Sequence, residues 1–521
     1  MRSFLVVTTL LAIAIGWWIN QVNRQKAAIR EMERLGVRFS YERQRDPKTG
    51  KVVPSKLSWL IDWVGIDAVT PITRVHAGQG TVDSLEFLSG LTKLNYLDLA
   101  SCPAEDYSPL KHCTHLQTLF LQNSQIESVD MLESLTELEE INLEATGVAD
   151  LSPLRKCLEL RYVNLGSTRV TDLSPLTQMT NMKQLVINET KVASLAPLEN
   201  MTQLKRLNAN KTSVADLAPL AKMTRLTSIH LSGSPIRSFD PLRELVQLEA
   251  IGVDGYEISD ASPLAALTNV VTLHLTGGDF NSIEFLTPMH SLVELVLKDI
   301  PATDLTPLGD LPNLSDLTLH GLPAKDLTPL SKTQLVNLII RQMPVSDIAP
   351  PLANKELLFL IVTDAAIRSL ESIGDRKQLY LLSIDNCPVD DITPLSKLQQ
   401  IEHLYLNGLT LKDPTQISGL PPVSTLDLSR TNIADLSAYK HLAQLDALVL
   451  SQTKITDLSA LARCTRLDKL ELCETHVTDF RPLFQLHSLL HLDVEGTSIS
   501  PQQLKDLQGS LPNCIIYDDN H

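Results

Sequence analysis

The sequence repeats with a period of 22 residues over most of its length. A nonpolar residue opens each copy, from Val82 to Ile499, and only the step from Ala324 to Val345 is 21 residues long. Nineteen copies fit between these limits. Because one 22-residue unit cannot bury its apolar face alone, a period this constant predicts a solenoid in which stacked neighbours share one core.

Within each copy the frame is Leu-x-x-Leu-x-Leu, as in residues 116–121 and 467–472. This alternation predicts a short strand with one buried face. With this frame the chain resembles the leucine-rich repeat family, in its short 22-residue, internalin-like class and in a bacterial membrane-anchored form. The resemblance covers about four-fifths of the chain. It implies an α/β fold, a right-handed solenoid with a parallel sheet on the concave face and short helical turns on the convex face.

A polar residue recurs two positions after each opening residue, Asp in thirteen copies and Ser in the other six. A row of carboxylates could bind calcium, but a calcium array needs Gly-rich turns that offer carbonyl oxygens, and these copies lack them. Asp and Ser can both accept a hydrogen bond from the first free N–H groups of a helix. Pro follows three residues later in most copies, as at Pro153, where a missing N–H costs little. The pattern therefore predicts a helix N-cap in every copy.

The amino terminus carries sixteen uncharged residues, Phe4–Ile19. As a helix this run is about 24 Å long, slightly short of a bilayer core of about 30 Å, and Trp17 and Trp18 follow where an interfacial belt lies. We expect residues 1–20 to form an uncleaved single-pass signal-anchor, so that the chain is a membrane protein. A cleaved signal peptide is the alternative, although no small-x-small site follows the run. The basic residues that follow favour a cytoplasmic repeat domain, whereas the short tail before the run favours export, so the side stays open.

The remaining segments outside the repeats are expected to form a linker and two caps. Residues 21–57 are predicted to be a basic juxtamembrane helix and linker, residues 58–81 an N-terminal cap, residues 82–499 the nineteen repeats and residues 500–521 a C-terminal cap. Such caps cover the exposed end repeats of a solenoid. The apolar residues expected to cover the first repeat are Val37, Phe39, Tyr41, Trp59, Leu60, Trp63 and Val64.

Composition and motifs argue against nucleic-acid binding and catalysis. The net charge is −16, and the sequence lacks a Gly-rich phosphate loop, H-E-x-x-H, C-x-x-C and G-x-S-x-G. His230, His274 and His320 are predicted to lie two repeats apart, about 10 Å for each pair, which is too far to share one metal ion. Cys113 and Cys157 are separated by the same spacing, which is too long for a disulfide. We expect a monomeric, non-enzymatic chain without cofactor, metal or disulfide.

Two classes of binding function fit such a chain. The first is a scaffold that binds a protein on its concave sheet, and the second is a surface or adhesion module that binds carbohydrate or cell-wall material. A carbohydrate site would need aromatic rings beside the amides of the concave face, and the sequence places its aromatics well apart, which favours a protein partner. The amides are Asn142, Asn164, Asn188, Asn208 and Asn210, and the aromatics are Tyr96, Phe120, Tyr162, Phe359 and Tyr405.

One cluster of concave positions is predicted to be apolar and to bind this partner. Side chains that alternate with the strand Leu residues point away from the core, and adjacent strands lie about 4.8 Å apart, so these side chains form one patch. The alternative is that another part of the chain covers them. The predicted partner-binding residues are Val296, Ile339, Phe359, Ile361, Leu381 and Tyr405.

The repeat is least regular near residues 325–360. The gap between Leu330 and Leu335 is one residue short, and Pro350-Pro351 adds one residue before Leu352. The corner position that holds Thr in other copies is mostly apolar in this region. We predict a local change of curvature there that divides two more regular arms.

Overall fold

The computed structural model describes residues 2–41, 66, 70–78, 80, 82–255, 257–374, 376–439 and 441–519. The chain forms two compact units, residues 1–254 (unit 1) and residues 255–521 (unit 2). Trp59, Leu60, Trp63 and Val64, which the sequence assigns to the N-terminal cap, lie outside the described residues.

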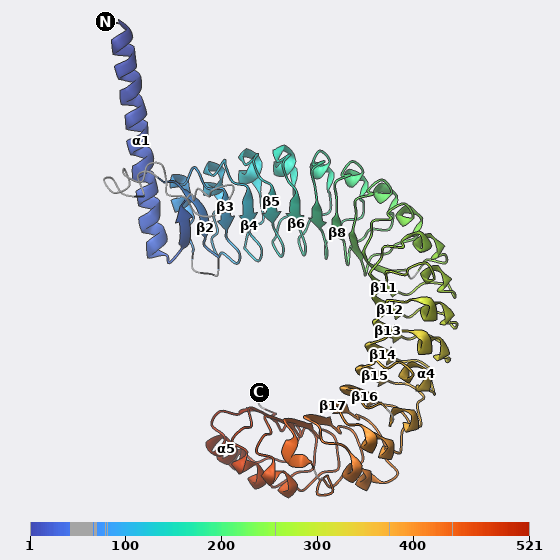
Figure 1. Ribbon diagram of the computed structural model, residues 1–521. Helices are drawn as coiled ribbons and strands as arrows, with labels where there is room; N and C mark the ends of the chain where they lie inside the picture. The colour runs from blue at the N-terminus through green and yellow to red at the C-terminus, as the bar shows by residue number, and fades with distance from the viewer. Residues whose placement is uncertain are drawn as a thin grey trace. The chain divides into compact units, whose positions relative to one another are not determined.

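In both units each repeat contributes one strand to a parallel sheet and one short helix, mostly a 3-10 helix, to the opposite face (Figure 1). The described elements of unit 1 are α1 (Arg2–Arg34), β1 (Arg38–Tyr41), β2 (Ile72–His76), η1 (Glu86–Gly90), β3 (Tyr96–Asp98), η2 (Ser108–His112), β4 (Thr118–Phe120), η3 (Asp130–Ser134), β5 (Glu140–Asn142), η4 (Ser152–Lys156), β6 (Tyr162–Asn164), η5 (Ser174–Leu176), β7 (Gln184–Val186), η6 (Ala196–Leu198), β8 (Arg206–Asn208), η7 (Ala218–Leu220), β9 (Ser228–Leu231), η8 (Asp240–Leu242) and β10 (Ala250–Asp254).

The described elements of unit 2 are η9 (Ser262–Ala266), β11 (Thr272–Thr276), η10 (Glu284–Leu286), β12 (Glu294–Lys298), η11 (Thr306–Asp310), β13 (Asp316–His320), η12 (Thr328–Lys332), β14 (Asn337–Arg341), α4 (Ala349–Leu352), β15 (Phe359–Thr363), η13 (Glu371–Ile373), β16 (Leu381–Asp385), η14 (Thr393–Lys397), β17 (His403–Tyr405), η15 (Pro414–Gly419), β18 (Thr425–Asp427), η16 (Leu442–Gln444), β19 (Ala447–Val449), η17 (Ser459–Arg463), β20 (Lys469–Glu471), η18 (Arg481–Gln485), β21 (His491–Asp493), α5 (Pro501–Ser510) and β22 (Ile515–Tyr517).

The strands pair in parallel with a constant register, β2 through β10 in unit 1 and β11 through β22 in unit 2. The register stacks the frame Leu residues directly, for example Leu97 on Leu119 in unit 1 and Leu404 on Leu426 in unit 2. All four side chains have 0% exposed surface. The predicted parallel sheet with short helical turns is therefore confirmed, and its core is a column of Leu side chains between the two faces.

The recurrent Asp and Ser residues cap the short helices. In all thirteen Asp copies a carboxylate oxygen accepts the N–H of the residue two positions on, at 2.7–3.0 Å, and in five Ser copies the hydroxyl does so at 3.0–3.3 Å. The predicted position needs one correction. In most copies the capping residue stands one place before the N-cap, because the next residue, such as Leu151 before η4, already accepts the first helical hydrogen bond. Asp413 is an N-cap in the strict sense, since η15 begins directly after it.

A buried hydroxyl closes the corner after many strands. In eight copies the Thr Oγ1 donates to the carbonyl of the last frame residue three positions before it, at 2.6–2.9 Å. The residue before each of these Thr has a positive φ, as at Ala145 with 54°. The left-handed residue turns the chain, and the hydroxyl satisfies a carbonyl that the turn removes from the sheet.

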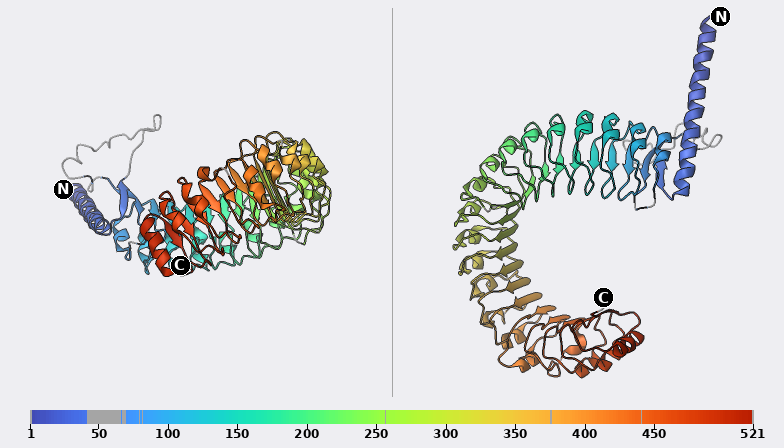
Figure 2. Two further views of the ribbon diagram at one scale, coloured as in Figure 1. Left: turned by 90° about the horizontal axis from the view of Figure 1, so that it is seen from below. Right: turned by 180° about the vertical axis from the view of Figure 1, so that it is seen from behind.

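Helix α1 is continuous from Arg2 to Arg34. Its second half packs on the first repeat, where Ala28, Ile29 and Met32 are 4%, 7% and 0% exposed. The Gln25 side chain donates to Thr70 O at 3.0 Å and accepts from Ile72 N at 3.4 Å. The first half of the helix projects beyond the repeats (Figures 1 and 2), and its described apolar side chains are exposed. This helix is long and apolar enough to cross a membrane, although a signal sequence would have the same properties.

Next to α1, β1 pairs with β2 antiparallel, with Phe39 opposite Val75. Val37, directly before β1, is 7% exposed. At the other end of the chain, α5 begins with a capping box in which Ser500 and Gln503 exchange hydrogen bonds, and its Leu507 is fully buried. Both terminal repeats are thus covered by a helix and a flanking strand.

The division between units does not fall where the sequence predicts a break. It lies between Asp254 and Gly255, whereas β13 to β16 keep their parallel register through residues 325–360 without interruption. The missing residue before Leu335 is taken up in the turn after η12, and the added Pro350-Pro351 turns the next short helix into the α-helix α4. A change of curvature in this stretch stays a prediction.

Candidate protein-interaction surface on the concave face

The predicted partner-binding residues lie on strands β12 to β17 of unit 2, on the concave face of the sheet, which points away from the core. Each strand alternates buried and half-exposed side chains, so that the neighbours Leu338, Ile340 and Leu360 are buried in the core. The half-exposed residues are Val296, Ile339, Phe359, Ile361, Leu381 and Tyr405.

The parallel register brings four of the six together. Ile339 is paired with Ile361, and Phe359 is paired with Leu381, on the adjacent strands β14, β15 and β16. Thr318 separates Val296 from Ile339. Ser383, which is only 5% exposed, separates Ile361 from Tyr405. The apolar centre is therefore more compact than the sequence predicts, with two outlying members.

Sequence reasoning missed three further apolar residues beside this centre, Val336, Leu358 and Tyr380. They precede β14, β15 and β16 and stay aligned, because the N–H of Leu358 donates to Val336 O and the N–H of Tyr380 donates to Leu358 O. Leu358 is 37% exposed. The sequence could have revealed them, because Val336, Leu358 and Tyr380 are spaced 22 residues apart and so occupy the same position of successive repeats. We call the seven residues of this surface the apolar patch; they are Val336, Ile339, Leu358, Phe359, Ile361, Tyr380 and Leu381.

An aromatic row closes one end of the apolar patch. The rings of Phe359 and Tyr380 meet edge to face with centroids 5.8 Å apart, and the His403 ring lies 5.2 Å beyond Tyr380. The Tyr380 hydroxyl donates to Glu402 Oε2 at 2.9 Å, and this carboxylate raises the pKa of Tyr380. Such amphipathic rings are typical anchors of protein interfaces.

The concave face of unit 1 is polar by contrast, and four of the five amides that the sequence predicts there already accept a backbone N–H. Asn142 Oδ1 accepts the N–H of Glu144 at 2.9 Å, Asn164 Oδ1 accepts the N–H of Gly166 at 3.0 Å, and Asn208 Oδ1 accepts the N–H of Asn210 at 3.2 Å. These side chains satisfy backbone donors at the strand ends.

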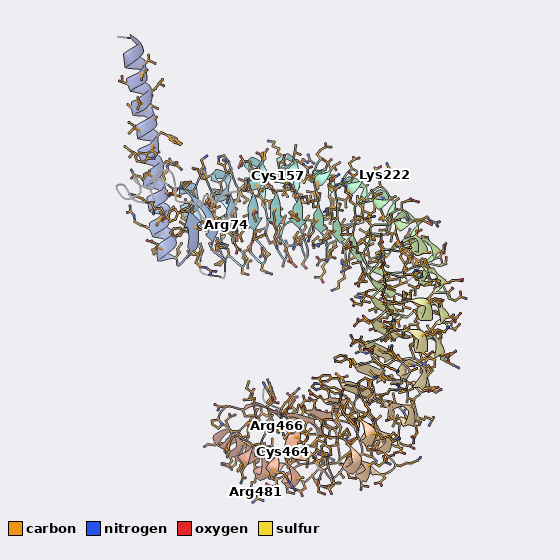
Figure 3. The ribbon with its side chains drawn as sticks, in the orientation of Figure 1. Arg74, Cys157, Lys222, Cys464, Arg466 and Arg481 are labelled. Carbon is orange, nitrogen blue, oxygen red and sulfur yellow. The ribbon has the colours of Figure 1, made fainter. Side chains whose placement is uncertain are left out.

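The aromatics of unit 1 are not well apart, contrary to the sequence prediction. The rings of Tyr96 and Phe120 are 5.7 Å apart and perpendicular, and His76 lies 4.8 Å from Tyr96. The sequence prediction missed these pairs because they are diagonal contacts: Tyr96 is the first residue of β3, whereas His76 and Phe120 are the last residues of β2 and β4. Arg74, which lies among the first strands (Figure 3), covers the Tyr96 ring at 4.2 Å. Tyr96 and Phe120 therefore meet edge to face, and Arg74 covers one face of Tyr96, so the rings do not form a flat platform.

The histidines and cysteines offer no further chemistry in the described residues. His274 lies 2.9 Å from Glu294, His320 lies 4.0 Å from Asp299, and His230 lies 3.0 Å from Ser228 Oγ. No group of three His, Cys, Asp or Glu in the described part of the chain could hold a metal ion. All seven cysteines are free thiols, among them Cys157 in unit 1 and Cys464 in unit 2 (Figure 3). Burial raises the pKa of both to about 11, which keeps them protonated.

A hollow of about 420 Å³ lies at the carboxyl end of the unit 2 sheet. Its wall includes Lys469, Glu471, His491, Asp493 and Tyr517. Lys469 Nζ is already paired with Glu471 Oε1 at 2.8 Å, so the hollow offers a largely neutralised charge pair rather than an open apolar surface.

Comparison with known proteins agrees with this fold. Residues 114–156 match the family described as Leucine Rich repeats (2 copies). The LRR ectodomain of the plant membrane receptor kinase GASSHO1/SCHENGEN3 from Arabidopsis thaliana is 19% identical, with a TM-score of 0.58 over 86% of this chain and 56% of that chain. A TDR receptor is 14% identical, with a TM-score of 0.56 over 88% of this chain and 91% of that chain. No curated protein matches the sequence.

A solved internalin from Listeria monocytogenes is 22% identical to this chain over 75% of this chain and 89% of that chain, with a TM-score of 0.35. With its 22-residue frame, its parallel sheet and the match of residues 114–156, this chain has the leucine-rich-repeat fold. The bacterial, membrane-anchored form stays a prediction.

Proposed function

We propose that the chain is a non-enzymatic scaffold that binds a protein partner on the concave sheet of unit 2, at the apolar patch. The observation that carries this proposal is seven large apolar side chains, none of them buried, of which four stand on three adjacent strands and three directly precede them. A contiguous apolar surface of this kind usually marks an interface. The same fold holds a protein ligand in the Arabidopsis ectodomain, which was solved in complex with Casparian Strip Integrity Factor 2.

The competing function is recognition of carbohydrate or cell-wall material. Sugars bind to flat aromatic faces and to free amides. The rings of Tyr96 and Phe120 are perpendicular, Arg74 occupies one face of Tyr96, and Asn142 and Asn164 serve the backbone. A protein partner therefore agrees better with the concave face. A glycan array probed with the full chain tests the competitor, which predicts saturable binding to at least one glycan class.

A matched pair of Phe variants tests the protein-binding proposal. Phe359 lies on the apolar patch in unit 2, and Phe120 is a half-buried concave residue of unit 1. A protein or peptide binder is selected from a display library on the full chain in detergent micelles. We expect Phe359→Ala to weaken its binding by about 2 kcal/mol or more, which is about 30-fold, and Phe120→Ala to leave it unchanged. Equal losses of thermal stability and binding in Phe359→Ala would place the residue in the core and the site elsewhere.

We also propose that α1 is an uncleaved membrane anchor. The helix continues unbroken from the apolar run into the residues that cap the first repeat, so no extended segment is available for a signal peptidase between them. Arg24, Lys26 and Arg30 follow the run on the same helix and can contact lipid headgroups. Amino-terminal sequencing of the purified protein tests this: a mature chain that begins after residue 20 would contradict the anchor.

A further inference from the structure

Three basic residues form a row beside the apolar patch. Lys298, His320 and Arg341 occupy the last position of β12, β13 and β14, and the register pairs Lys298 with His320 and His320 with Arg341. Adjacent strands of a sheet are about 4.8 Å apart, so the two ends of the row are about 10 Å apart. Arg341 is two residues from Ile339 on the same face of β14, so the row borders the apolar patch directly.

Two members of this basic row have no anionic partner within the described residues. No described carboxylate lies within 4.0 Å of the Lys298 ammonium or the Arg341 guanidinium. Other basic groups on the same sheet do have one: Lys469 pairs with Glu471 at 2.8 Å, and His274 pairs with Glu294 at 2.9 Å. Lys298 and Arg341 therefore present unpaired positive charge next to an apolar surface, whereas His320 between them lies 4.0 Å from Asp299. The net charge of the chain is −16.

The opposite border of the same strands carries the opposite charge. Glu294 and Asp316 stand at the first positions of β12 and β13, each four residues before a member of the basic row. Asp316 is also held by the side chains of Ser315 and Asn337. A carboxylate on a bound segment is therefore repelled from this border and attracted to the basic row. A charge pair that forms beside the apolar patch is also stronger than one in open water, because the bound segment excludes water and lowers the local dielectric constant.

We infer that the partner segment is amphipathic and acidic: its apolar side chains cover the apolar patch, and Asp or Glu side chains along one side pair with Lys298 and Arg341. This inference rests on the proposed function and adds the partner's chemistry and its orientation across the strands. The segment crosses β12 to β16, with its carboxylates toward the ends of β12 to β14, because the same border ends in Thr363 on β15 and in Asp385 on β16. A basic segment, or one without charge, is disfavoured by the same arrangement.

Selection of 16-residue peptides from a random display library on the full chain in detergent micelles tests the inference. We expect the enriched peptides to combine apolar residues with an excess of Asp and Glu, and to lose affinity as the NaCl concentration rises. The double variant K298E/R341E is expected to bind the selected peptides at least tenfold more weakly than the wild type. The control K325E/K377E changes two exposed lysines of unit 2 that lie outside the strands, makes an equal number of charge reversals, and is expected to change the affinity less than twofold.

The outcomes separate the inference from the proposed function. One outcome is a set of neutral or basic peptides that bind Phe359→Ala more weakly but bind K298E/R341E as tightly as the wild type. This outcome overturns the inference of an acidic partner and leaves the apolar patch as the binding site. Peptides that bind Phe359→Ala unchanged overturn the proposed function as well. A library that yields no peptide dependent on either variant overturns both.

Discussion

Two runs of strands differ in the way they end, β3 to β8 in unit 1 and β11 to β16 in unit 2. The first set has three residues per strand, and most of its corners hold a Thr whose hydroxyl bonds the carbonyl of the last frame residue. The second set has five residues per strand, and its corners hold residues such as Ile300, Leu322 and Met343, which are buried but cannot donate.

The difference shows how one corner position controls the width of the concave face. Where the hydroxyl closes the turn, the strand ends one residue before the last frame residue, as at Asn142 before Leu143. Where an aliphatic side chain fills the corner, two more residues stay in the strand, and these include Lys298, His320 and Arg341. β3 and β17 are exceptions, since each has three residues although Cys102 and Leu409 fill their corners. The wider sheet of unit 2 is therefore where a basic row and an apolar patch can lie side by side.

The largest expected effect comes from the alternation of inner and outer side chains on β14. Leu338 is fully buried, and its neighbour Ile339 belongs to the apolar patch. We expect Leu338→Ala to lower the free energy of unfolding by about 3 kcal/mol and Ile339→Ala by less than about 1 kcal/mol, because only the first opens a cavity. Urea unfolding of both variants measures this. Comparable losses of stability in the two variants would mean that the side chain of Ile339 is buried like that of Leu338, so that the apolar patch belongs to the core.

Two glycines at the ends of the units give the next effect. A Cβ on Gly90 would lie 2.6 Å from the backbone oxygen of Arg24 in α1, whereas a Cβ on Gly509 in α5 would meet nothing within 4 Å. We expect Gly90→Ala to destabilise unit 1 by about 2 kcal/mol through overpacking, and Gly509→Ala to stabilise unit 2 by about 0.5 kcal/mol through helix propensity. Thermal unfolding compares the two. A neutral Gly90→Ala would show that α1 does not press on the first repeat.

The corner hydroxyls give a smaller effect that is confined to the copies that carry them. Thr168 is 7% exposed, and its Oγ1 donates to Leu165 O at 2.6 Å. Thr168→Val keeps the shape and removes this hydrogen bond, so we expect a loss of about 1 kcal/mol in the free energy of unfolding. The matched control is Thr118→Val on the concave face of β4, which is expected to be neutral. If Thr168→Val is as stable as the wild type, the hydroxyl does not stabilise the corner, and it is rejected as the cause of the short strands.

The smallest effect is a difference in acid sensitivity between the units. Hydrogen bonds from the hydroxyl and the N–H of Ser174 lower the pKa of Asp172, and the Arg481 side chain and N–H lower the pKa of Asp479 to about 2. A lowered pKa stabilises the folded state above the unfolded value of about 3.9, and this contribution is lost as the pH falls toward the folded value. Among the described capping Asp for which a shift is resolved, seven in unit 2 have a lowered pKa, against three in unit 1.

We therefore expect pepsin to cleave unit 2 at a higher pH than unit 1 in a titration from pH 4 to pH 2, with the sites identified by mass spectrometry. The variant Asp479→Ser retains a capping hydroxyl and removes the titrating group, so it is expected to shift cleavage of the last repeats to lower pH. Simultaneous cleavage of both units would show that the capping carboxylates do not set the acid limit.

Most of the fold could be predicted because it depends on local rules that the chain repeats. The Leu frame sets which side chain is buried, and Asp or Ser two residues after the opening position caps the turn that follows. The continuity of α1 with the cap depends on contacts with residues 45 to 71 positions away, such as Gln25 with Thr70 and Gln21 with Thr92, and no periodicity encodes them. The approach of Tyr96 to Phe120 is likewise a diagonal contact between two strands, which a list of single positions does not reveal.

The candidate site could be predicted only in part for the same reason. Ile339, Phe359, Ile361 and Leu381 follow from alternation within each strand. Val336, Leu358 and Tyr380 precede their strands, so alternation alone does not place them, and their alignment appears only when adjacent repeats are stacked.

Hydroxyl-radical footprinting of the full chain, with and without a selected binder, tests the central claim most directly, because it reports which side chains become protected. The account predicts protection of Leu358, Phe359, Tyr380 and Leu381 in unit 2 and unchanged reactivity of Tyr96, Phe120 and Tyr162 in unit 1. Protection of the unit 1 aromatics without protection of the apolar patch would contradict it.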